Sequence, residues 1–334
     1  MSDQKTLNFE PLYASLKEKH PSLLQMLVWK DGETVLNENN SAARLDARTN
    51  FLTTVVRPFL PLLTHTRVTL SDFRSDLKNV RSVTKSITSI LTGMVFGSRI
   101  EEQLDEPIAT YFPSIKDDPK AAIRLHHLLS NTSGLPTIED VRSMRRLLST
   151  PNWADTILRY PLQAAPGETY IYSAANFHLT NAILARVSGA NLLEYAKIEL
   201  FSPLGIQSLF WNCDPQGVPF GGSDLYLRAE DMLKIGQLCL NKGKWKNRHI
   251  IPSTWLELAT QPRIKVNEAD NYGYGWWVDH NREAGCCHTI SACGVGGQRI
   301  VLVPHEKTVI VTTSLTSLHV DSSVIDDAIC DFFQ

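Results

Sequence analysis

The chain lacks the features that mark exported, membrane-spanning or nucleic-acid-binding proteins. Its 334 residues begin without the apolar core of a signal peptide, and no apolar run approaches the length of a membrane span. The formal net charge of −2 offers no general attraction to nucleic acids or anionic membranes. We therefore expect a cytoplasmic protein that binds neither, and the sequence leaves its oligomeric state open.

The sequence also lacks a CxxC pair, although it contains six cysteines: Cys213, Cys239, Cys286, Cys287, Cys293 and Cys330. Without a secretion signal we expect these cysteines to be free thiols. The run Cys286-Cys287-His288 could suggest a metal site, but adjacent cysteines chelate poorly and no second ligand cluster follows. No metal and no other cofactor is predicted.

A GxSxG nucleophile elbow is absent as well, so His126 and His127 have no partner motif for a serine–histidine triad. We expect them to cap or pack at a helix start. The chain instead contains Ser82-Val83-Thr84-Lys85, followed by an apolar helical run over residues 86–95. This spacing places a hydroxyl and an amine on one helical face, where burial of the amine would favour its neutral, proton-accepting form.

The SxxK spacing is weak evidence by itself, because it also occurs at Ser75-Asp76-Leu77-Lys78. That second copy lies in a charged stretch, where we expect a solvated turn. For the first copy, a helix-capping Ser82 followed by an exposed Lys85 remains an alternative to catalysis. The rest of the chain has to decide between the two.

Strand patterns occur near both ends of the chain. A helix over residues 11–24 is predicted to precede strands over 25–30 and 33–37, joined by an Asp31-Gly32 hairpin turn. Three further strands are predicted over residues 288–293, 299–303 and 308–313, followed by a helix over 322–333. Helical periodicity dominates the region between.

This order predicts an α+β fold, with an antiparallel sheet built from both termini, flanking helices and an inserted, mainly helical subdomain. We place the sheet subdomain at residues 1–80 plus 263–334 and the helical subdomain at residues 81–262. The active site is expected at the interface between them.

Several motifs in order resemble the serine β-lactamase and penicillin-binding-protein superfamily, most closely the class C β-lactamase-like esterases and the 6-aminohexanoate-dimer hydrolases. The resemblance runs through most of the chain and implies a β-lactamase/transpeptidase-like fold. The motifs that carry it are residues 81–86, residues 127–135, Pro166-Gly167-Glu168 leading to Tyr172-Ser173, residues 272–277, and Gly294 to Gln298 before a strand that ends at Pro304.

The resemblance implies that Ser82 is the nucleophile and that Lys85 and Tyr172 share the proton as general base and acid. Downstream residues align so that Tyr172 takes this role and Tyr170 takes a packing position, although a merely buried tyrosine remains the alternative for Tyr172. The backbone N–H groups of Ser82 and Val295 would form the oxyanion hole. Glu168 follows a turn common in the family and is not assigned a role.

Two positions depart from the family pattern. Ala174 stands where penicillin-recognising enzymes have an asparagine, and Ala292 stands where a cationic residue usually recognises the substrate carboxylate. Asn176 is near in sequence, but nothing indicates that it reaches the site. The predicted substrate-binding residues are Ala174, Cys293, Gly294 and Trp277. Cys293 is interpreted mainly as a small packing residue, and Trp277 fits a pocket wall and a core position equally well.

The sequence thus predicts a serine hydrolase that cleaves a small ester or amide through an acyl-Ser82 intermediate. Acyl transfer from the same intermediate is the nearest alternative. A binding or sensor protein without turnover is an alternative of another class. β-Lactamase or D,D-peptidase activity ranks below these, given Ala174 and Ala292.

Overall fold

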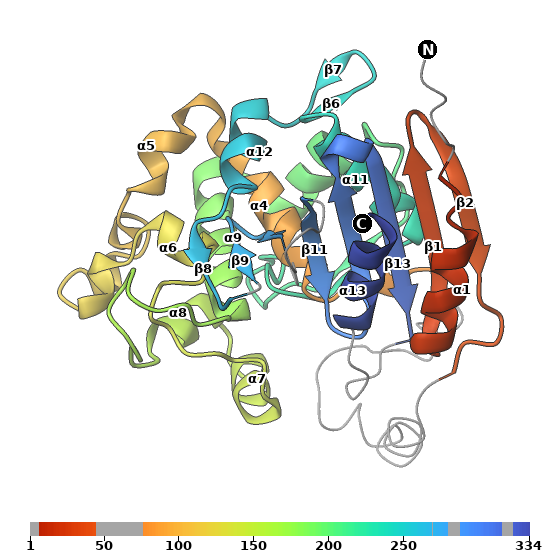
Figure 1. Ribbon diagram of the computed structural model, residues 1–334. Coiled ribbons are helices and arrows are strands. Elements are labelled where there is room, and N and C mark those ends of the chain that lie inside the picture. The colour runs from red at the N-terminus through yellow and green to blue at the C-terminus, as the bar shows by residue number, and fades with distance from the viewer. Residues whose placement is uncertain (1–6, 45–75, 269, 280–287, 316–322) are drawn as a thin grey trace.

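The computed structural model describes residues 7–44, 76–268, 270–279, 288–315 and 323–334 (Figure 1). The helices are α1 (Glu10–Lys19), α4 (Val83–Phe96), α5 (Ile100–Leu104), α6 (Leu125–Leu129), α7 (Val141–Leu148), α8 (Trp153–Leu158), α9 (Ala174–Ser188), α10 (Leu192–Tyr195), α11 (Ala229–Leu240), α12 (Ser253–Ala259) and α13 (Ser323–Phe332). The strands are β1 (Leu23–Lys30), β2 (Glu33–Asn39), β3 (Lys78–Asn79), β4 (Phe210–Trp211), β5 (Leu225–Leu227), β6 (Lys244–Trp245), β7 (Arg248–His249), β8 (Ile264–Lys265), β9 (Asn271–Tyr272), β10 (Trp277–Val278), β11 (Ile290–Gly294), β12 (Gln298–Val303) and β13 (Thr308–Ser314).

The main sheet joins the two ends of the chain, as the sequence predicts. Its eight strands follow the order β2-β1-β13-β12-β11-β10-β9-β8, with antiparallel neighbours throughout. The β1–β2 hairpin turns at Asp31 and Gly32, both with positive φ, which suits the two-residue turn expected there. This arrangement confirms the mixed α+β fold.

Helices cover both faces of the sheet (Figure 1). On one face, α1 and α13 pack together over a hydrophobic cluster that includes Leu16, Val28 and Ile329. On the other face, α11 packs on β1, β12 and β13, and α4 packs on β11 and β12. The larger hydrophobic cluster is continuous from this face into the helical region. The division into subdomains at residues 80/81 and 262/263 stays a prediction.

The first helix is shorter than its periodicity suggests. It ends at Lys19, and strand β1 already begins at Leu23. Pro21 explains the difference, because proline lacks the N–H that a continuing helix needs and disfavours helical geometry in the residue before it. The expected helix over residues 11–24 is therefore wrong beyond Lys19.

The prediction of free cysteines is also wrong at one position. Cys213, Cys239 and Cys293 are free thiols, whereas Cys330 on α13 forms a disulfide. The pattern-based expectation failed because it used only the absence of a CxxC pair and of a secretion signal, while a disulfide depends on three-dimensional proximity. Cys286 and Cys287 lie outside the described residues.

Within the described parts of the chain, no helix is long and apolar enough to cross a membrane.

Helix α4, which bears Lys85 in its first turn, is almost entirely buried. Only Met94 and Val95 of its residues reach the surface even in part. Gly93 lets the helix approach α12, because the indole of Trp255 occupies the space that a side chain would need. Trp255 in turn donates its Nε1–H to Ser89 O at 2.8 Å and stacks on Tyr274.

Replacing Gly93 with alanine tests this packing. Alanine normally stabilises a helix interior by about 1 kcal/mol relative to glycine. Here the new Cβ would lie 2.0 Å from Trp255 Cδ1, so the indole has to move. We expect Gly93→Ala to lower the free energy of unfolding by about 1–3 kcal/mol, measured by urea denaturation. An unchanged or higher stability would show that Trp255 does not fix the position of α4.

Candidate active site

The turn before α4 holds Ser82 in a constrained backbone. Arg81 has φ of 54°, a left-handed conformation that is unfavourable for an arginine. The Asn79 side chain stabilises it by accepting the Arg81 N–H at 2.9 Å, and Asn79 itself donates to Asp224 Oδ1 at 3.0 Å. Ser82 therefore enters the helix from a turn that is fixed by β3 and the segment before β5.

The Ser82 hydroxyl does not cap the helix, although Ser82 occupies the N-cap position of α4. Its Oγ instead accepts a hydrogen bond from Lys85 Nζ at 3.0 Å. Lys85 is only 1% exposed, so it is not the solvated lysine of the alternative interpretation. Ser82 therefore stands at the N-cap position without making the capping hydrogen bond, and the exposed lysine of the alternative interpretation is contradicted. The second SxxK copy gives no comparable pair, because Lys78 lies in strand β3 and Ser75 lies outside the described residues.

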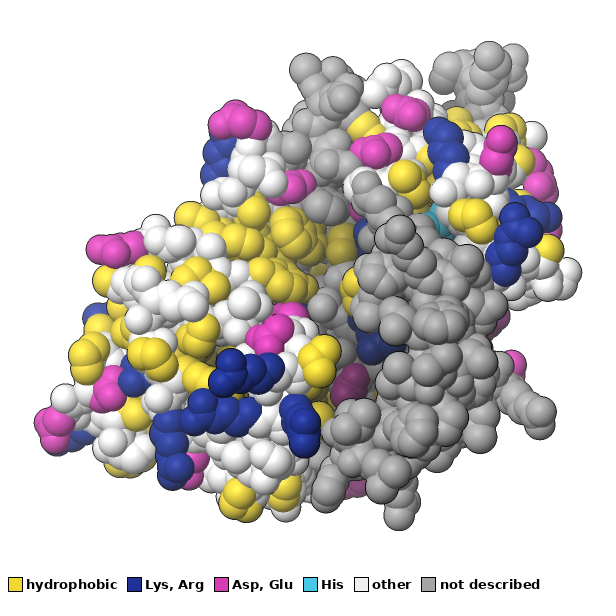
Figure 2. Space-filling view, turned by 90° about the horizontal axis from the view of Figure 1, so that it is seen from below, with side chains coloured by type: hydrophobic (Ala, Val, Ile, Leu, Met, Phe, Trp, Pro, Cys, Tyr) yellow, Lys and Arg dark blue, Asp and Glu magenta, His cyan; other side chains and the backbone are white. Residues whose placement is uncertain are grey.

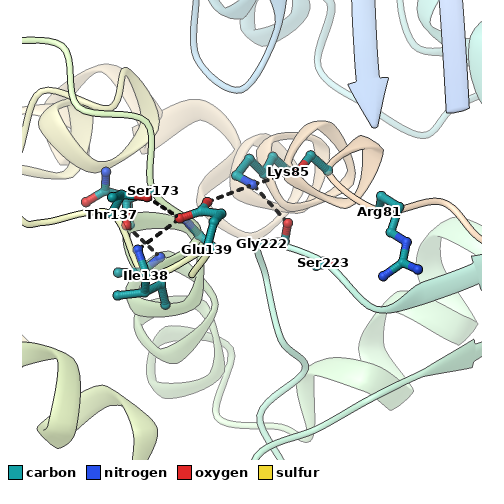
Figure 3. A network of polar contacts seen from close by, with 12 residues as sticks. Arg81, Lys85, Thr137, Ile138, Glu139, Ser173, Gly222 and Ser223 are labelled. Atoms are coloured by element: carbon teal, nitrogen blue, oxygen red, sulfur yellow. Dashed lines mark hydrogen bonds and ion pairs between the residues drawn. The ribbon is translucent and has the colours of Figure 1, made fainter. Parts of the chain in front are cut away.

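Several groups from distant segments surround the Lys85 amine (Figure 3). Nζ donates to Gly222 O at 3.0 Å and lies 3.7 Å from Glu139 Oε1. It also lies 4.4 Å from the centroid of the Tyr172 ring, over the ring face. The predicted trio of Ser82, Lys85 and Tyr172 is therefore brought together. Proton-transfer hydrogen bonds often tighten only when substrate is bound, so the ring-face contact leaves the proposed role of Tyr172 open to test.

Tyr172 belongs to an aromatic cluster beside the amine. Its ring stacks on Trp277 with centroids 6.2 Å apart, and Tyr170 and Tyr272 pack around the same pair. Burial raises the pKa of both Tyr170 and Tyr272 well above the ordinary tyrosine value, so both phenols stay protonated. Tyr170 thus suits the packing position expected for it. Trp277 is half-buried and adjoins Tyr172, so its role as a pocket wall remains a prediction.

Asn176 does not reach the amine but fixes the loop around residue 131. It is fully buried, donates to Asn131 Oδ1 at 3.0 Å and accepts from Ser133 Oγ at 2.6 Å. Asn131 Oδ1 also accepts the backbone N–H of Ser173. These bonds join the residue 127–135 motif to the start of α9, next to Tyr172.

The end of β11 approaches the turn that carries Ser82. A side chain at Gly294 would lie 2.4 Å from Val80 O, so only glycine permits this approach. Arg299 donates to Gly294 O at 2.9 Å, and its guanidinium is paired with Asp326 on α13. Because the C=O and N–H of a trans peptide point in opposite directions, Arg299 orients the Val295 N–H away from itself. The assignment of Ser82 and Val295 as oxyanion donors stays a prediction, and this geometry supports it.

The remaining predicted binding residues differ in their access. Ala174 is 2% exposed, and Ala292, which was predicted only to lack the family's cation, is 1% exposed, so neither presents much side-chain surface to a substrate. Cys293 is half-buried, and burial raises its thiol pKa well above the usual cysteine range. A thiol held protonated is a poor nucleophile, which favours the packing role of Cys293.

Sequence reasoning missed two groups, Glu139 and Gly222. The carboxylate of Glu139 accepts the Ala174 N–H at 2.7 Å, besides facing Lys85. A side chain at Gly222 would lie 2.4 Å from Ala174 Cβ, so this glycine allows the backbone to reach the amine. The consecutive glycines at 221 and 222 were the available signal for a close backbone approach. At position 139 the only sequence signal was an acidic residue next to Asp140, which caps α7.

Helix α7 begins directly after this acidic segment and carries three arginines. Arg142, Arg145 and Arg146 line a shallow surface hollow with Val141 and Ser149. Figure 2 shows Lys and Arg side chains gathered on this face of the molecule. All three arginines are exposed, as expected for a solvated basic face. Elsewhere, His288 Nδ1 lies 2.6 Å from Asp279 Oδ1, and the described residues include no cluster of three or more metal-ligating side chains.

Comparison with known proteins settles the family. The family described as Beta-lactamase matches residues 76–327, which is most of the chain and includes all the groups described above. The chain belongs to the beta-lactamase family. Its superfamily was therefore predicted correctly from the SxxK pair and its companion motifs. Membership places the protein in a family of hydrolases, while the substrate and the individual residue roles are left to the proposals below.

Individual relatives are distant. The 6-aminohexanoate-dimer hydrolase of Paenarthrobacter ureafaciens is 23% identical over 262 residues, covering 70% of this chain and 66% of the relative. The chain thus spans slightly less than two thirds of that protein. Among solved structures, EstCE1, a hydrolase with promiscuous acyltransferase activity, has a TM-score of 0.70 at 18% identity, covering 96% of this chain and 97% of its own. A penicillin-binding protein from Bacillus halodurans has a TM-score of 0.67 at 17% identity, covering 96% and 100%. These structures support the fold.

His127 at the start of α6 makes this part of the beta-lactamase fold sensitive to acid. Its Nδ1 accepts the Arg124 N–H at 3.1 Å, which requires the neutral imidazole, and its ring lies beside Gly167. Burial above all, together with the nearby His126 and Arg124, lowers the pKa of His127 from 6.5 to about 4. The unfolded chain therefore binds this proton at a higher pH than the folded protein does.

The consequence is a loss of stability with a defined pH window. His127 should destabilise the fold progressively as the pH falls from about 6.5 to about 4, with no further loss below that range. Urea denaturation across this range should show a shallower decline for His127→Gln than for the unchanged protein. His305→Gln, at an exposed histidine, is the control and should keep the original slope. Identical slopes for all three proteins would contradict the assignment.

Proposed function

We propose that this protein is a serine hydrolase that cleaves a small ester or amide through an acyl-Ser82 intermediate. The observation that carries the proposal is the hydrogen bond from the buried Lys85 amine to Ser82 Oγ, at a serine whose side chain leaves the helix uncapped. A hydroxyl paired with a desolvated amine is the arrangement that nucleophilic catalysis requires. A serine that only begins a helix does not require a hydrogen bond from a buried amine.

The surrounding groups support each step. Ser82 Oγ attacks the substrate carbonyl, and its proton passes to the Lys85 and Tyr172 pair, which lie in contact. The N–H groups of Ser82 and Val295 hold the developing oxyanion. The same pair returns the proton to the leaving alcohol or amine. Water then hydrolyses the acyl-enzyme with the proton moving in the same way, which restores Ser82.

Acyl transfer is the second candidate, because an alcohol or amine can replace water at the same intermediate. The fold likeness to EstCE1, a hydrolase with promiscuous acyltransferase activity, supports this candidate. Penicillin-type substrates rank lower, since the side chains at Ala174 and Ala292 are short, apolar and buried.

Steady turnover of a nitrophenyl ester would exclude a sensor that acylates once and stalls. A single stoichiometric burst would support that sensor.

The nucleophile is tested with a fluorophosphonate probe and a nitrophenyl ester. We expect labelling of the intact protein at Ser82, no labelling of Ser82→Ala, and a loss of ester turnover in Ser82→Ala of at least about a thousandfold. Ser89→Ala is a matched control, because Ser89 lies on the same helix and its buried Oγ has no hydrogen-bond partner among the described residues. Labelling that survives in Ser82→Ala would refute the proposal.

The oxyanion hole is tested at Gly294. Gly294→Ala places a Cβ 2.4 Å from Val80 O, which forces the end of β11 away from the Ser82 turn. We expect kcat for the nitrophenyl ester to fall by about two to three powers of ten, as for the loss of one oxyanion donor. Circular dichroism should show that the fold is retained, and Ser291→Ala on the same strand serves as the control. Full activity in Gly294→Ala would exclude Val295 as a donor.

A further inference from the structure

The Lys85 amine has an acceptor in each of three directions. Nζ donates to Ser82 Oγ at 3.0 Å and to Gly222 O at 3.0 Å, and Glu139 Oε1 lies 3.7 Å away. An ammonium has three N–H donors and no acceptor: two make the hydrogen bonds to Ser82 and Gly222, and the third can face the Glu139 carboxylate at ion-pair distance. A neutral amine has only two donors, and its lone pair would have to point at Ser82 Oγ before it could take the serine proton.

Glu139 is fixed in place on both of its oxygens. Oε1 accepts the Ala174 N–H at 2.7 Å, and Oε2 accepts the Thr137 hydroxyl at 2.7 Å and the Ile138 N–H at 2.9 Å. Three donors therefore aim the carboxylate toward the amine, as Figure 3 shows. The side chain of Glu139 is 36% exposed whereas that of Lys85 is 2% exposed, so the carboxylate reaches solvent while the amine is buried.

We infer that Glu139 is a positioning residue that acts through Lys85: it keeps the third proton on the amine in the resting protein and holds that amine against Ser82. This inference rests on the proposed function, in which Ser82 is the nucleophile. Activation then requires one N–H bond of Lys85 to break, with the proton leaving to solvent and the freed lone pair facing Ser82 Oγ. Glu139 opposes this step because an opposite charge within about 4–6 Å favours the charged form.

Other titratable groups face the same region, and they do not replace Glu139. Among the described residues, Glu139 is the one carboxylate within ion-pair distance of Lys85. Arg81 precedes Ser82, and its guanidinium extends away from the amine (Figure 3). The other titratable groups on the elements packed around the pair are Asp140, Tyr170, Tyr172, Asp224, Tyr272, Cys293 and Arg299.

The same carboxylate also links Lys85 to Tyr172. Glu139 Oε1 faces Nζ and accepts the N–H of Ala174, two residues after Tyr172 and at the first turn of α9. Its position therefore sets how the tyrosine-bearing segment lies against the amine. A neutral glutamine could still accept the Ala174 N–H, so Glu139→Gln removes the charge while retaining an acceptor.

The titration of Lys85 in the full-length protein tests the inference directly. Lysine-selective ¹³C labelling gives one NMR signal for each lysine, and Lys85→Met, or Lys85→Arg if that variant is unstable, identifies the signal of Lys85. We expect Glu139→Gln to lower the titration midpoint of Lys85 by about one pH unit, a tenfold change in proton affinity. Asp140→Asn removes a neighbouring carboxylate that instead caps α7, and it should leave the midpoint nearly unchanged.

The pH profile of fluorophosphonate labelling gives a second measure. Below the Lys85 midpoint, Glu139→Gln should label Ser82 faster than the unchanged protein, because more of its amine is neutral. In Glu139→Gln, the acidic limb of the pH profile of the labelling rate should move by the same amount as the NMR midpoint of Lys85. A purely structural role would lower the maximum rate without moving the limb.

The outcomes separate the two proposals. An unchanged titration midpoint of Lys85 in folded Glu139→Gln would overturn this inference. Glu139 would then have only the structural role of holding its loop in place. If glutamine prevents folding, Glu139→Asn provides the same charge removal, with the same two results expected. A protein that is never labelled at Ser82 would contradict the proposed function, whereas the NMR midpoint would still decide whether Glu139 holds the proton on Lys85.

Discussion

The buried amine of Lys85 is the constraint on which the rest of the site depends. Removing an ammonium from water costs several kcal/mol unless fixed acceptors replace the lost hydration. The replacement groups are the hydroxyl of Ser82, the carbonyl of Gly222 and the carboxylate of Glu139. They come from the turn before α4, from the segment before β5 and from the loop before α7. One side chain therefore ties three distant parts of the chain together.

Close approach of backbones makes this convergence possible. Gly222 brings its carbonyl to the amine because no Cβ separates it from Ala174. Gly294 brings β11 to the Ser82 turn in the same way, and Arg299, paired with Asp326, then fixes the orientation of that peptide. Positive φ at Arg81 supplies the entry angle of α4. The geometry around Ser82 is thus set by backbone positions more than by neighbouring side chains.

Local patterns explain which parts could be predicted from the sequence. The SxxK pair and the Asp31-Gly32 turn involve residues at most three apart, and each appears in the structure as expected. Glu139 could not be found in this way, because its partner Lys85 is far away in the chain and an acidic residue before a helix ordinarily suggests a cap. The disulfide at Cys330 was missed for the same reason, since spacing reveals little about proximity in the fold. The first helix was extended too far because the apolar pattern was weighed above Pro21.

The position of Glu139 also bears on the two departures from the family pattern. Where a penicillin-recognising enzyme has an asparagine, this chain has Ala174, whose N–H binds the Glu139 carboxylate. An asparagine amide both donates and accepts hydrogen bonds, whereas a carboxylate accepts only. An asparagine at position 174 could thus bind a polar group of a substrate through its amide, whereas the side chain of Ala174 is a buried methyl group. If Ser82 is the nucleophile, recognition of the acyl group cannot depend on an amide at position 174, because a methyl group neither donates nor accepts a hydrogen bond.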